Sequence, residues 1–302
     1  MKHMKKTTSD IAFNILNYTF FILFTIICVY PFYYILINTI SDNTMSANGL
    51  IRFLPSGIHL DNYKQILKLG GIGQAALISV LRTVIGTVCT VLASGFLGYM
   101  LSQEKMWKRK FCYRFLIATM YFNAGLIPLY LTMKNLHLVN NFLVYIIPAI
   151  VQPFNIILVK TYTESIPKSL QEAAEIDGAG FMKIFWKVIL PVSKPILATI
   201  AIFSAVGQWN SFQDTLIYVT DNKLYSLQYL LYTYINQANS LSTMIKNTTS
   251  ATSLNMDSLM NQQTPTSIRM TVTAVVVIPI LLVYPMFQKY FVKGIMIGSV
   301  KG

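Results

Sequence analysis

Long uncharged apolar runs constrain this sequence more than any other feature. Residues 11–40 contain no Asp, Glu, Lys or Arg in 30 positions, and about 20 apolar residues suffice to cross the hydrocarbon core of a bilayer. Runs of similar length recur at about 73–102, 115–133, 138–159, 195–213 and 270–288. The first run is longer than the apolar core of a signal peptide. The sequence therefore predicts an all-α polytopic membrane protein with six transmembrane helices.

Positive charge predicts the orientation of these helices. The chain has 24 Lys and Arg against 11 Asp and Glu, yet only 12% of it is charged and 54% is hydrophobic. Such an apolar chain is unsuited to nucleic acid and points to membrane lipid as its surroundings. With the amino terminus in the cytoplasm, the cytoplasmic segments hold fifteen Lys and Arg and the external segments hold five. The positive-inside rule then predicts two cytoplasmic termini.

This topology divides the chain into three parts. Residues 1–10 form a cytoplasmic tail, residues 11–288 the six-span transmembrane domain, and residues 289–302 a second cytoplasmic tail. An external segment at 214–269 becomes rich in Ser, Thr, Asn and Gln from Asn236 onward. That composition does not form a packed core. The segment is expected to be either a mobile loop or a surface that meets another protein outside the membrane.

The sequence lacks the patterns typical of catalysis and of ATP binding. Its three cysteines and three histidines are scattered singly, so neither a metal site nor a nucleophile with its base is predicted. The cysteines lie in or beside apolar runs and are expected to be buried as small hydrophobes. No GxxxxGK[ST] phosphate loop occurs. We expect this chain to bind no cofactor, and any energy from ATP to come from a partner.

The most informative segment is residues 165–191, which lies between the fourth and fifth runs on the cytoplasmic side. Pro167 followed by Ser169 suits a helix start, and residues 170–176 are helix-forming. Gly178 and Gly180 supply the permissive backbone that ends this helix and turns the chain.

A second, amphipathic helix is predicted after that turn. One face gathers the apolar residues, and Lys183 and Lys187 share another. Asp177 is expected to cap this helix and Pro191 to end it. The apolar face comprises Phe181, Ile184, Phe185, Val188 and Ile189. Such an element either packs on a soluble partner or rests on lipid headgroups.

The segment resembles the EAA loop of permease subunits of binding-protein-dependent ABC importers. The residues that carry the resemblance are Glu172, Ala173, Ala174, Asp177, Gly178 and Ala179. Three further stretches resemble the MalG-like branch, which serves oligosaccharides: NAGLIPLY at 123–130, QWN at 208–210 and QKYFVKGIMIGSVKG at 288–302. The chain departs from that branch in having Gln208 where a His is common.

The resemblance implies a MetI-like permease fold and a multi-subunit importer in a bacterial cytoplasmic membrane. The expected partners are a second, homologous permease, two cytoplasmic ABC ATPases that use ATP and Mg, and an extracellular solute-binding protein. The EAA loop would form a coupling helix docked in a cleft of the ATPase, with Glu172 at the contact and Gly178 shaping the turn. The segment 214–269 would contact the binding protein.

The resemblance also implies a second contact with the ATPases. In the MalG-like branch the carboxyl-terminal tail reaches between the ATPase subunits. The residues of this chain that would do so are Ile297, Gly298, Ser299, Val300, Lys301 and Gly302.

Polar and aromatic residues in two spans are candidates for a sugar path, because sugars need hydrogen-bonding groups and an aromatic face. These residues are Tyr121, Asn123, Gln208, Trp209 and Asn210. They could equally make hydrogen bonds between helices.

The transported solute could also be a peptide, a polyamine or a metal chelate. A membrane-embedded enzyme would need paired ionisable groups near one membrane face, and a channel would need a pore-lining ring. The sequence favours neither.

Overall fold

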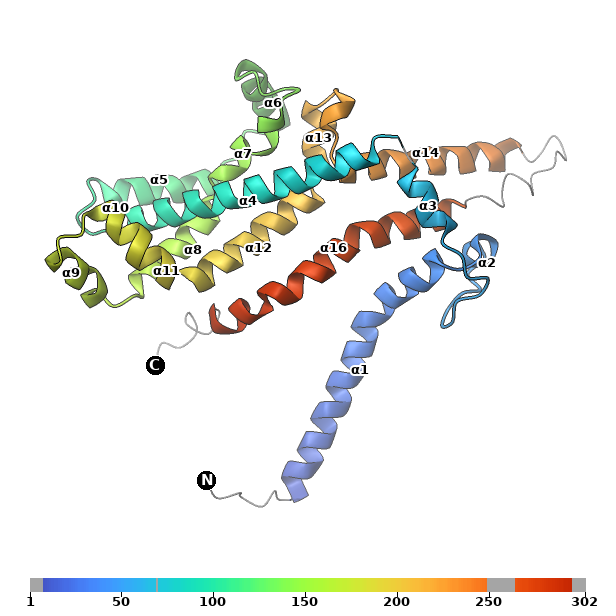
Figure 1. Ribbon diagram of the computed structural model, residues 1–302, viewed down its shortest axis with the longest axis horizontal. Helices are drawn as coiled ribbons and strands as arrows, with labels where there is room; N and C mark the ends of the chain where they lie inside the picture. The colour runs from blue at the N-terminus through green and yellow to red at the C-terminus, as the bar shows by residue number, and fades with distance from the viewer. Residues whose placement is uncertain (1–7, 69, 249–263, 295–302) are drawn as a thin grey trace. The chain divides into compact units, whose positions relative to one another are not determined.

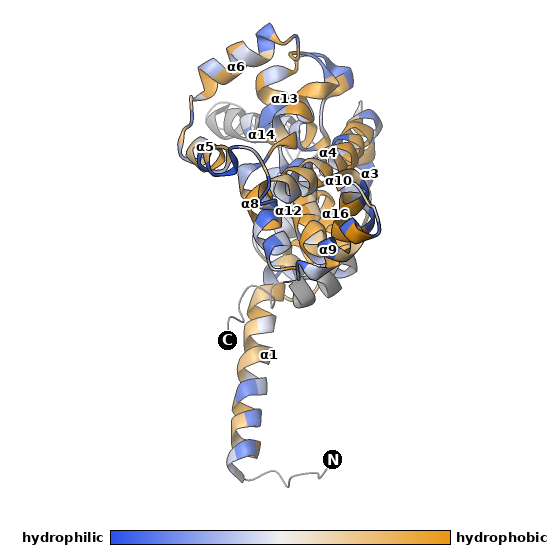
Figure 2. Ribbon diagram, turned by 90° about the vertical axis from the view of Figure 1, so that its left-hand side faces the viewer, coloured by the Kyte–Doolittle hydropathy of each residue, from blue (hydrophilic) through white to orange (hydrophobic). Residues whose placement is uncertain are grey.

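The structure is a computed structural model that describes residues 8–68, 70–248 and 264–294 (Figure 1). Every regular element in those ranges is a helix, as the apolar runs predicted. Among the described residues, three helices are long and apolar enough to cross a membrane: α1 (Thr8–Thr39), α4 (Ile72–Ser102) and α16 (Pro265–Gly294). Figure 2 shows the prevalence of apolar residues along α4 and α16. At 31 residues, α4 is about 46 Å long.

Three further apolar stretches are each bent into two helical parts. The first consists of α5 (Arg109–Tyr121) and α6 (Leu126–Asn135), which meet at 118°. In the second, η1 (Phe142–Tyr145) and α7 (Ile147–Ile150) meet α8 (Pro153–Glu164) at 44°. In the third, α10 (Phe181–Ile184), η2 (Phe185–Ile189) and α11 (Leu190–Val192) meet α12 (Lys194–Asn210) at 79°. Counting each bent pair as one span gives up to six candidate spans.

The bends within the third and fourth runs lie at single residues. Between α5 and α6, Gly125 adopts φ +86°, a backbone conformation that suits glycine. Between α7 and α8, Pro153 has no N–H to bond backwards, and Gln152 before it is extended. Both bends thus follow from the conformational limits of single residues.

The remaining helices connect the candidate spans: α2 (Asn43–Ala47), α3 (Asp61–Leu67), α9 (Ser169–Ile176), α13 (Gln213–Tyr218), η3 (Asn222–Leu224) and α14 (Leu227–Thr248). The polar segment after Asn236 is therefore helical as far as Thr248, which its composition did not predict. Residues 249–263 lie outside the described ranges. The cysteines are also less buried than expected, since Cys28 is exposed and Cys89 and Cys112 are half-buried.

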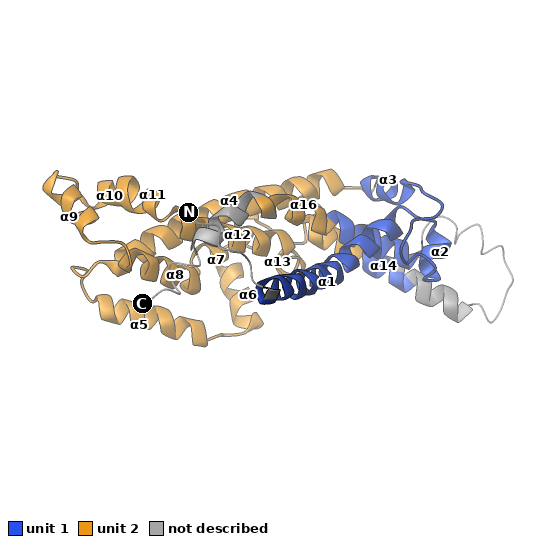
Figure 3. Cartoon of the chain, turned by 90° about the horizontal axis from the view of Figure 1, so that it is seen from below, with its two compact units in different colours: residues 1–68, 235–275 blue, residues 69–234, 276–302 orange. Residues whose placement is uncertain are grey.

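The chain divides into two compact units, residues 1–68 with 235–275 and residues 69–234 with 276–302 (Figure 3). In the first unit, buried amides attach α2 and α3 to the end of α1. Asn62 Nδ2 donates to Asn43 Oδ1 at 2.8 Å and to the Thr39 carbonyl at 3.0 Å. Ser46 Oγ donates to Asn38 Oδ1 at 2.7 Å.

In the second unit, α4 packs along both α8 and α12. Glycines permit the close approach, as small residues do between membrane helices. A Cβ on Gly98 would lie 2.6 Å from the Cβ of Val159, and one on Gly86 would lie 2.8 Å from Gln208 Nε2.

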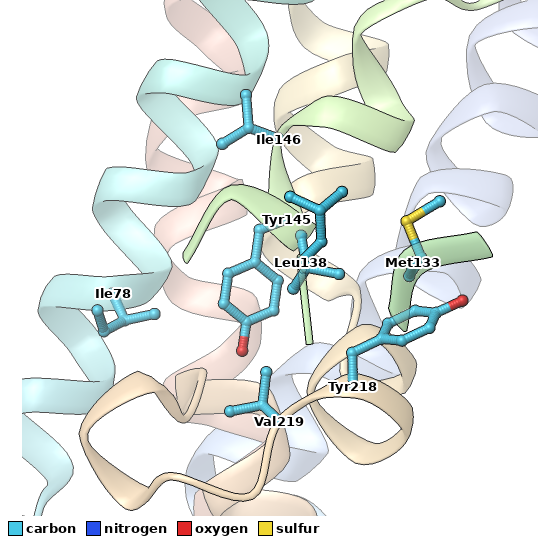
Figure 4. Close-up of a cluster of buried hydrophobic side chains, with 8 residues drawn as sticks. Ile78, Met133, Leu138, Tyr145, Ile146, Tyr218 and Val219 are labelled. Carbon is cyan, nitrogen blue, oxygen red and sulfur yellow. The ribbon is translucent and has the colours of Figure 1, made fainter. Parts of the chain in front are cut away.

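An apolar cluster joins α6, η1 and α13 to α4 near the amino end of α4 (Figure 4). It brings Ile78 of α4 together with Met133 of α6, Tyr145 of η1, and Tyr218 and Val219 from α13 and the residue after it. The cluster holds the short helices η1 and α13 against α4.

Candidate functional site

The segment 165–191 forms the helix–turn–helix that its pattern predicts. α9 ends at Ile176, and Gly178 adopts φ +73° in the turn before α10 begins at Phe181. Two details differ from the prediction. Asp177 is the C-cap residue of the first helix instead of the N-cap of the second, whose N-cap is Gly180. Pro191 lies in the first turn of α11 and does not end the helix there.

Aromatic stacking anchors this segment on the carboxyl end of α4. The Tyr99 ring stacks on Phe181 at 4.7 Å and on Phe185 at 5.6 Å between ring centroids. Ile184 and Ile189 are buried in the same cluster, whereas Lys183 and Lys187 are exposed. The predicted apolar face is therefore the face that packs on α4.

Polar contacts join α9 and the residue before it to the chain just beyond α4. Lys168 Nζ lies 2.6 Å from Glu104 Oε1, and Lys105 Nζ lies 3.4 Å from Glu175 Oε2. The hydrogen bond from Lys168 lowers the pKa of the Glu104 carboxyl, and the same contact raises the pKa of Lys168. Both pairs are exposed to solvent, so they orient α9 more than they stabilise it.

With respect to the described residues, the opposite side of α9 is exposed. Glu172 and Asp177 are exposed carboxylates. Beside them Ile176 is 85% exposed and Leu170 is 43% exposed. An apolar contact surface bordered by carboxylates is suited to a basic protein partner. We call these four residues the docking surface.

A buried cation forms a second polar centre, near the amino end of α4. Arg82 is 1% exposed and donates to Gln208 Oε1 at 3.0 Å, to the Ser211 carbonyl at 3.2 Å and to Asp214 Oδ2 at 2.6 Å. Its guanidinium also lies over the Tyr145 ring, 4.3 Å from the centroid. A buried charge is tolerated when it is paired and hydrogen-bonded in this way. Arg82 thus ties α4 to η1, α12 and α13.

A cavity of about 500 Å³ opens beside Arg82. Its walls come from α4, α6, η1, α7, α8, α12 and α13. Its polar lining includes Gln152, Asn155, Gln208, Ser211 and Asp214. The volume lies within the range of small-molecule sites, and polar groups converging on a largely apolar cavity are typical of them.

Metal binding is not suggested by the described residues. Within 8–68, 70–248 and 264–294, no group of three or more His, Cys, Asp or Glu side chains is placed to hold a metal ion.

Comparison with known proteins shows the family of this chain. Residues 4–297 match the family described as binding-protein-dependent transport system inner membrane component. The chain belongs to this family. It is accordingly a transport permease subunit and not an enzyme, as the EAA pattern and the missing phosphate loop predicted. Its fold is the MetI-like ABC permease fold.

Several permeases are similar over nearly their whole length. The polygalacturonan/rhamnogalacturonan transport system permease protein YtcP of Bacillus subtilis (strain 168) is 34% identical, covering 96% of this chain and 98% of that protein. The arabinooligosaccharides transport system permease protein AraQ of Halalkalibacterium halodurans is 29% identical, with coverage of 99% and 100%. A crystal structure of a bacterial ABC transporter that imports the acidic polysaccharide alginate contains a chain 29% identical, with a TM-score of 0.78 and coverage of 95% and 99%.

In this permease the predicted coupling residues lie together on α9 and the turn after it. Glu172 and Asp177 point outward, while Ala174 and Ala179 pack against the cluster around Tyr99. The proposed tail contact, Ile297, Gly298, Ser299, Val300, Lys301 and Gly302, lies outside the described residues.

The predicted path residues are dispersed in the permease. Gln208 lines the cavity, but both ends of its amide are engaged, with Arg82 and with the Tyr145 carbonyl. Trp209 lines a different, apolar cavity and donates to the Val276 carbonyl at 3.2 Å. Tyr121 is 88% exposed. The other two, Asn123 and Asn210, are also exposed.

Two functional features of the permease were not predicted from the sequence. Arg82 is a single charged residue inside the apolar run 73–102, which is a signal for a buried polar partner. Tyr99 carried no local signal, because its importance comes from stacking on residues about 80 positions later.

Proposed function

We propose that this permease is one membrane subunit of an ABC importer that translocates an oligosaccharide. The docking surface is the observation that carries the proposal. It presents two carboxylates and exposed apolar side chains on a helix fixed to α4, so a force applied there by a partner would be passed to a membrane-spanning helix.

The partner at this surface is proposed to be a cytoplasmic ABC ATPase, one of two that bind ATP and Mg. Glu172, Ala173, Ala174, Asp177, Gly178 and Ala179 form the coupling element, with Glu172 and Asp177 facing basic residues of the ATPase. Ile297, Gly298, Ser299, Val300, Lys301 and Gly302 are proposed to reach between the two ATPases. A second, homologous permease and an extracellular solute-binding protein complete the importer.

The proposed topology has six spans and two cytoplasmic termini in a bacterial cytoplasmic membrane. It is supported by the six candidate spans, with each bent pair counted once, and by fifteen cytoplasmic against five external Lys and Arg. The tails are 1–10 and 289–302, the membrane domain is 11–288, and the segment 214–269 meets the binding protein. In this orientation the docking surface is cytoplasmic and Arg82 lies toward the outer face.

Sugar is the proposed cargo because permeases similar over nearly the full chain carry the names of oligosaccharide and polysaccharide systems. We propose that the path passes the cavity beside Arg82, where Gln208 lies. Tyr121, Asn123, Trp209 and Asn210 stay candidates for parts of the path outside that cavity.

The docking role is tested by reversing one charge. Glu172→Lys should insert normally but lose the ATPase on pull-down, because it places like charges in contact. Asp61→Lys is the matched control, since Asp61 is an exposed carboxylate on α3, far along the chain from α9. Full recovery of the ATPase with Glu172→Lys would rule out the proposed contact.

A further inference from the structure

The cavity beside Arg82 contains a side-chain amide without a partner. Asn155 lines this cavity and is only 7% exposed, and its side chain makes no hydrogen bond to any residue within the described ranges. The oxygen and nitrogen of this amide are open to the cavity. They are therefore available to accept and donate hydrogen bonds to a ligand there.

The backbone next to Asn155 adds further donors. α8 begins at Pro153 after a 44° bend, and its first intrahelical bond runs from the Ile156 N–H to the Gln152 carbonyl at 3.1 Å. The N–H groups of Phe154 and Asn155 thus precede the helical ladder and have no acceptor within it. Broken helices of this kind mark substrate sites in membrane transporters, because irregular backbone is tolerated where it lines a cavity.

The rest of the lining matches the chemistry of a sugar. Phe154 and Phe203, which are 53% and 50% exposed, supply aromatic surface at the cavity. Asp214 supplies a carboxylate that is 38% exposed, and it uses Oδ2 for both Arg82 and Ser211. Aromatic surface, amides and a fixed carboxylate together suit a ring that carries hydroxyl groups. The apolar cavity lined by Trp209 and Pro279 lacks this combination.

We propose that this cavity is a substrate subsite of the permease itself, and that it holds one sugar ring of the passing oligosaccharide. Asn155 and the amino end of α8 bind the ring hydroxyls, Phe154 and Phe203 contact its faces, and Asp214 closes the outer side. The inference rests on the proposed function, because it requires an oligosaccharide cargo. It goes beyond that function in assigning direct substrate contact to this subunit.

Uptake kinetics test the amide. The complete importer with its binding protein is reconstituted in proteoliposomes, and uptake of short oligogalacturonides and arabino-oligosaccharides is measured. Asn155→Leu keeps the approximate volume and removes the hydrogen-bonding groups, so it should raise KM for the transported sugar roughly tenfold, the effect of one lost hydrogen bond. Thr199→Val is the control, because Thr199 is equally buried on α12 and bonds only within its own helix, to the Pro195 carbonyl. An unchanged KM for Asn155→Leu would contradict the proposal.

Ligand protection gives a second readout that a merely structural Asn155 would not produce. Cys28, Cys89 and Cys112 are first replaced by Ser or Ala, and Asn155→Cys is then labelled with a small water-soluble thiol reagent. During transport, the sugar should slow this labelling several-fold, while labelling of the control Leu67→Cys, at a 72% exposed position on α3, stays the same. Equal labelling of Asn155→Cys with and without sugar would overturn the subsite.

The wild-type importer separates the two possible failures. If wild type takes up neither sugar, the oligosaccharide function fails and the subsite with it. If wild type and Thr199→Val take up sugar, but KM and labelling at position 155 are unaffected, the subsite alone fails.

Discussion

Arg82 shows how one residue can fix the packing of several helices. Its guanidinium is 1% exposed, whereas its counter-ion Asp214 is 38% exposed. Removing Asp214 would therefore leave a buried, unpaired cation, whereas removing Arg82 would leave a partly hydrated carboxylate. An isolated buried cation is far more costly than a carboxylate that water still reaches.

That difference predicts which substitution lowers the free energy of unfolding more. Asp214→Leu should cost about 3–5 kcal/mol, because it leaves the Arg82 charge buried and uncompensated. Arg82→Met should cost less, since Asp214 remains partly hydrated. The double variant should be more stable than the sum of the single losses indicates. Thermal unfolding in detergent measures the order, and a larger loss for Arg82→Met would contradict this account.

Gly178 is a second residue whose conformation matters. Its φ of +73° penalises any residue with a Cβ, although no neighbour lies within 4 Å of that position. Gly178→Ala should therefore cost roughly 1–2 kcal/mol through backbone strain alone and weaken sugar-stimulated ATPase activity. Gly180→Ala is the matched control, because Gly180 is equally open but has a φ of −72°. Equal effects of the two substitutions would mean that the positive φ of Gly178 does not determine the cost.

At this scale the sequence predicted what local chemistry determines. The two-glycine turn, the apolar face with Ile184, and the exposed Lys183 and Lys187 all follow from spacing. The partners of Arg82 and Tyr99 did not, because they lie about 65 to 130 positions away in the chain.

At the scale of elements, α4 connects the segment 165–191, which carries the docking surface, to the buried Arg82. The carboxyl end of α4 carries Tyr99, which packs on the segment 165–191. Its amino half carries Arg82, which contacts η1, α12 and α13. A continuous helix between these points is a direct route for coupling. Coupling through it requires that α4 keep its close packing on α8 and α12.

Two glycines of α4 test this packing. A Cβ on Gly98 would lie 2.6 Å from the Val159 Cβ, whereas a Cβ on Gly95 would lie 3.5 Å from the Leu197 side chain, an ordinary contact. Gly98→Ala should therefore cost about 1–3 kcal/mol by overpacking. Gly95→Ala should be tolerated. Unfolding temperatures in detergent measure both, and a tolerated Gly98→Ala would mean that α4 and α8 pack less closely than described.

The apolar runs predicted where the helices lie, but hydropathy did not predict the bend at Gly125. Hydropathy averages over many residues, whereas the bends depend on single positions such as Gly125 and Pro153. The helix α14 was missed for a related reason. Low hydrophobicity argues against an independent core, but it does not prevent a helix that continues from the apolar residues at 227–232.

At the scale of the whole molecule, the chain is a permease whose sequence contains no GxxxxGK[ST] phosphate loop. It belongs to a family of transport-system membrane components, and it presents a docking surface attached to its central helix. ATP binding by a partner can shift its conformation only by as much as that partner prefers one state over another.

Purification of the tagged chain in mild detergent tests whether the permease assembles with an ATPase and a second permease. The co-purifying proteins are identified by mass spectrometry, and ATP hydrolysis is measured with oligosaccharides and the binding protein. We expect a P-loop ATPase and a second permease, with hydrolysis that the transported sugar stimulates. Recovery of a lone chain, or of a homo-oligomer without an ATPase, would contradict the account.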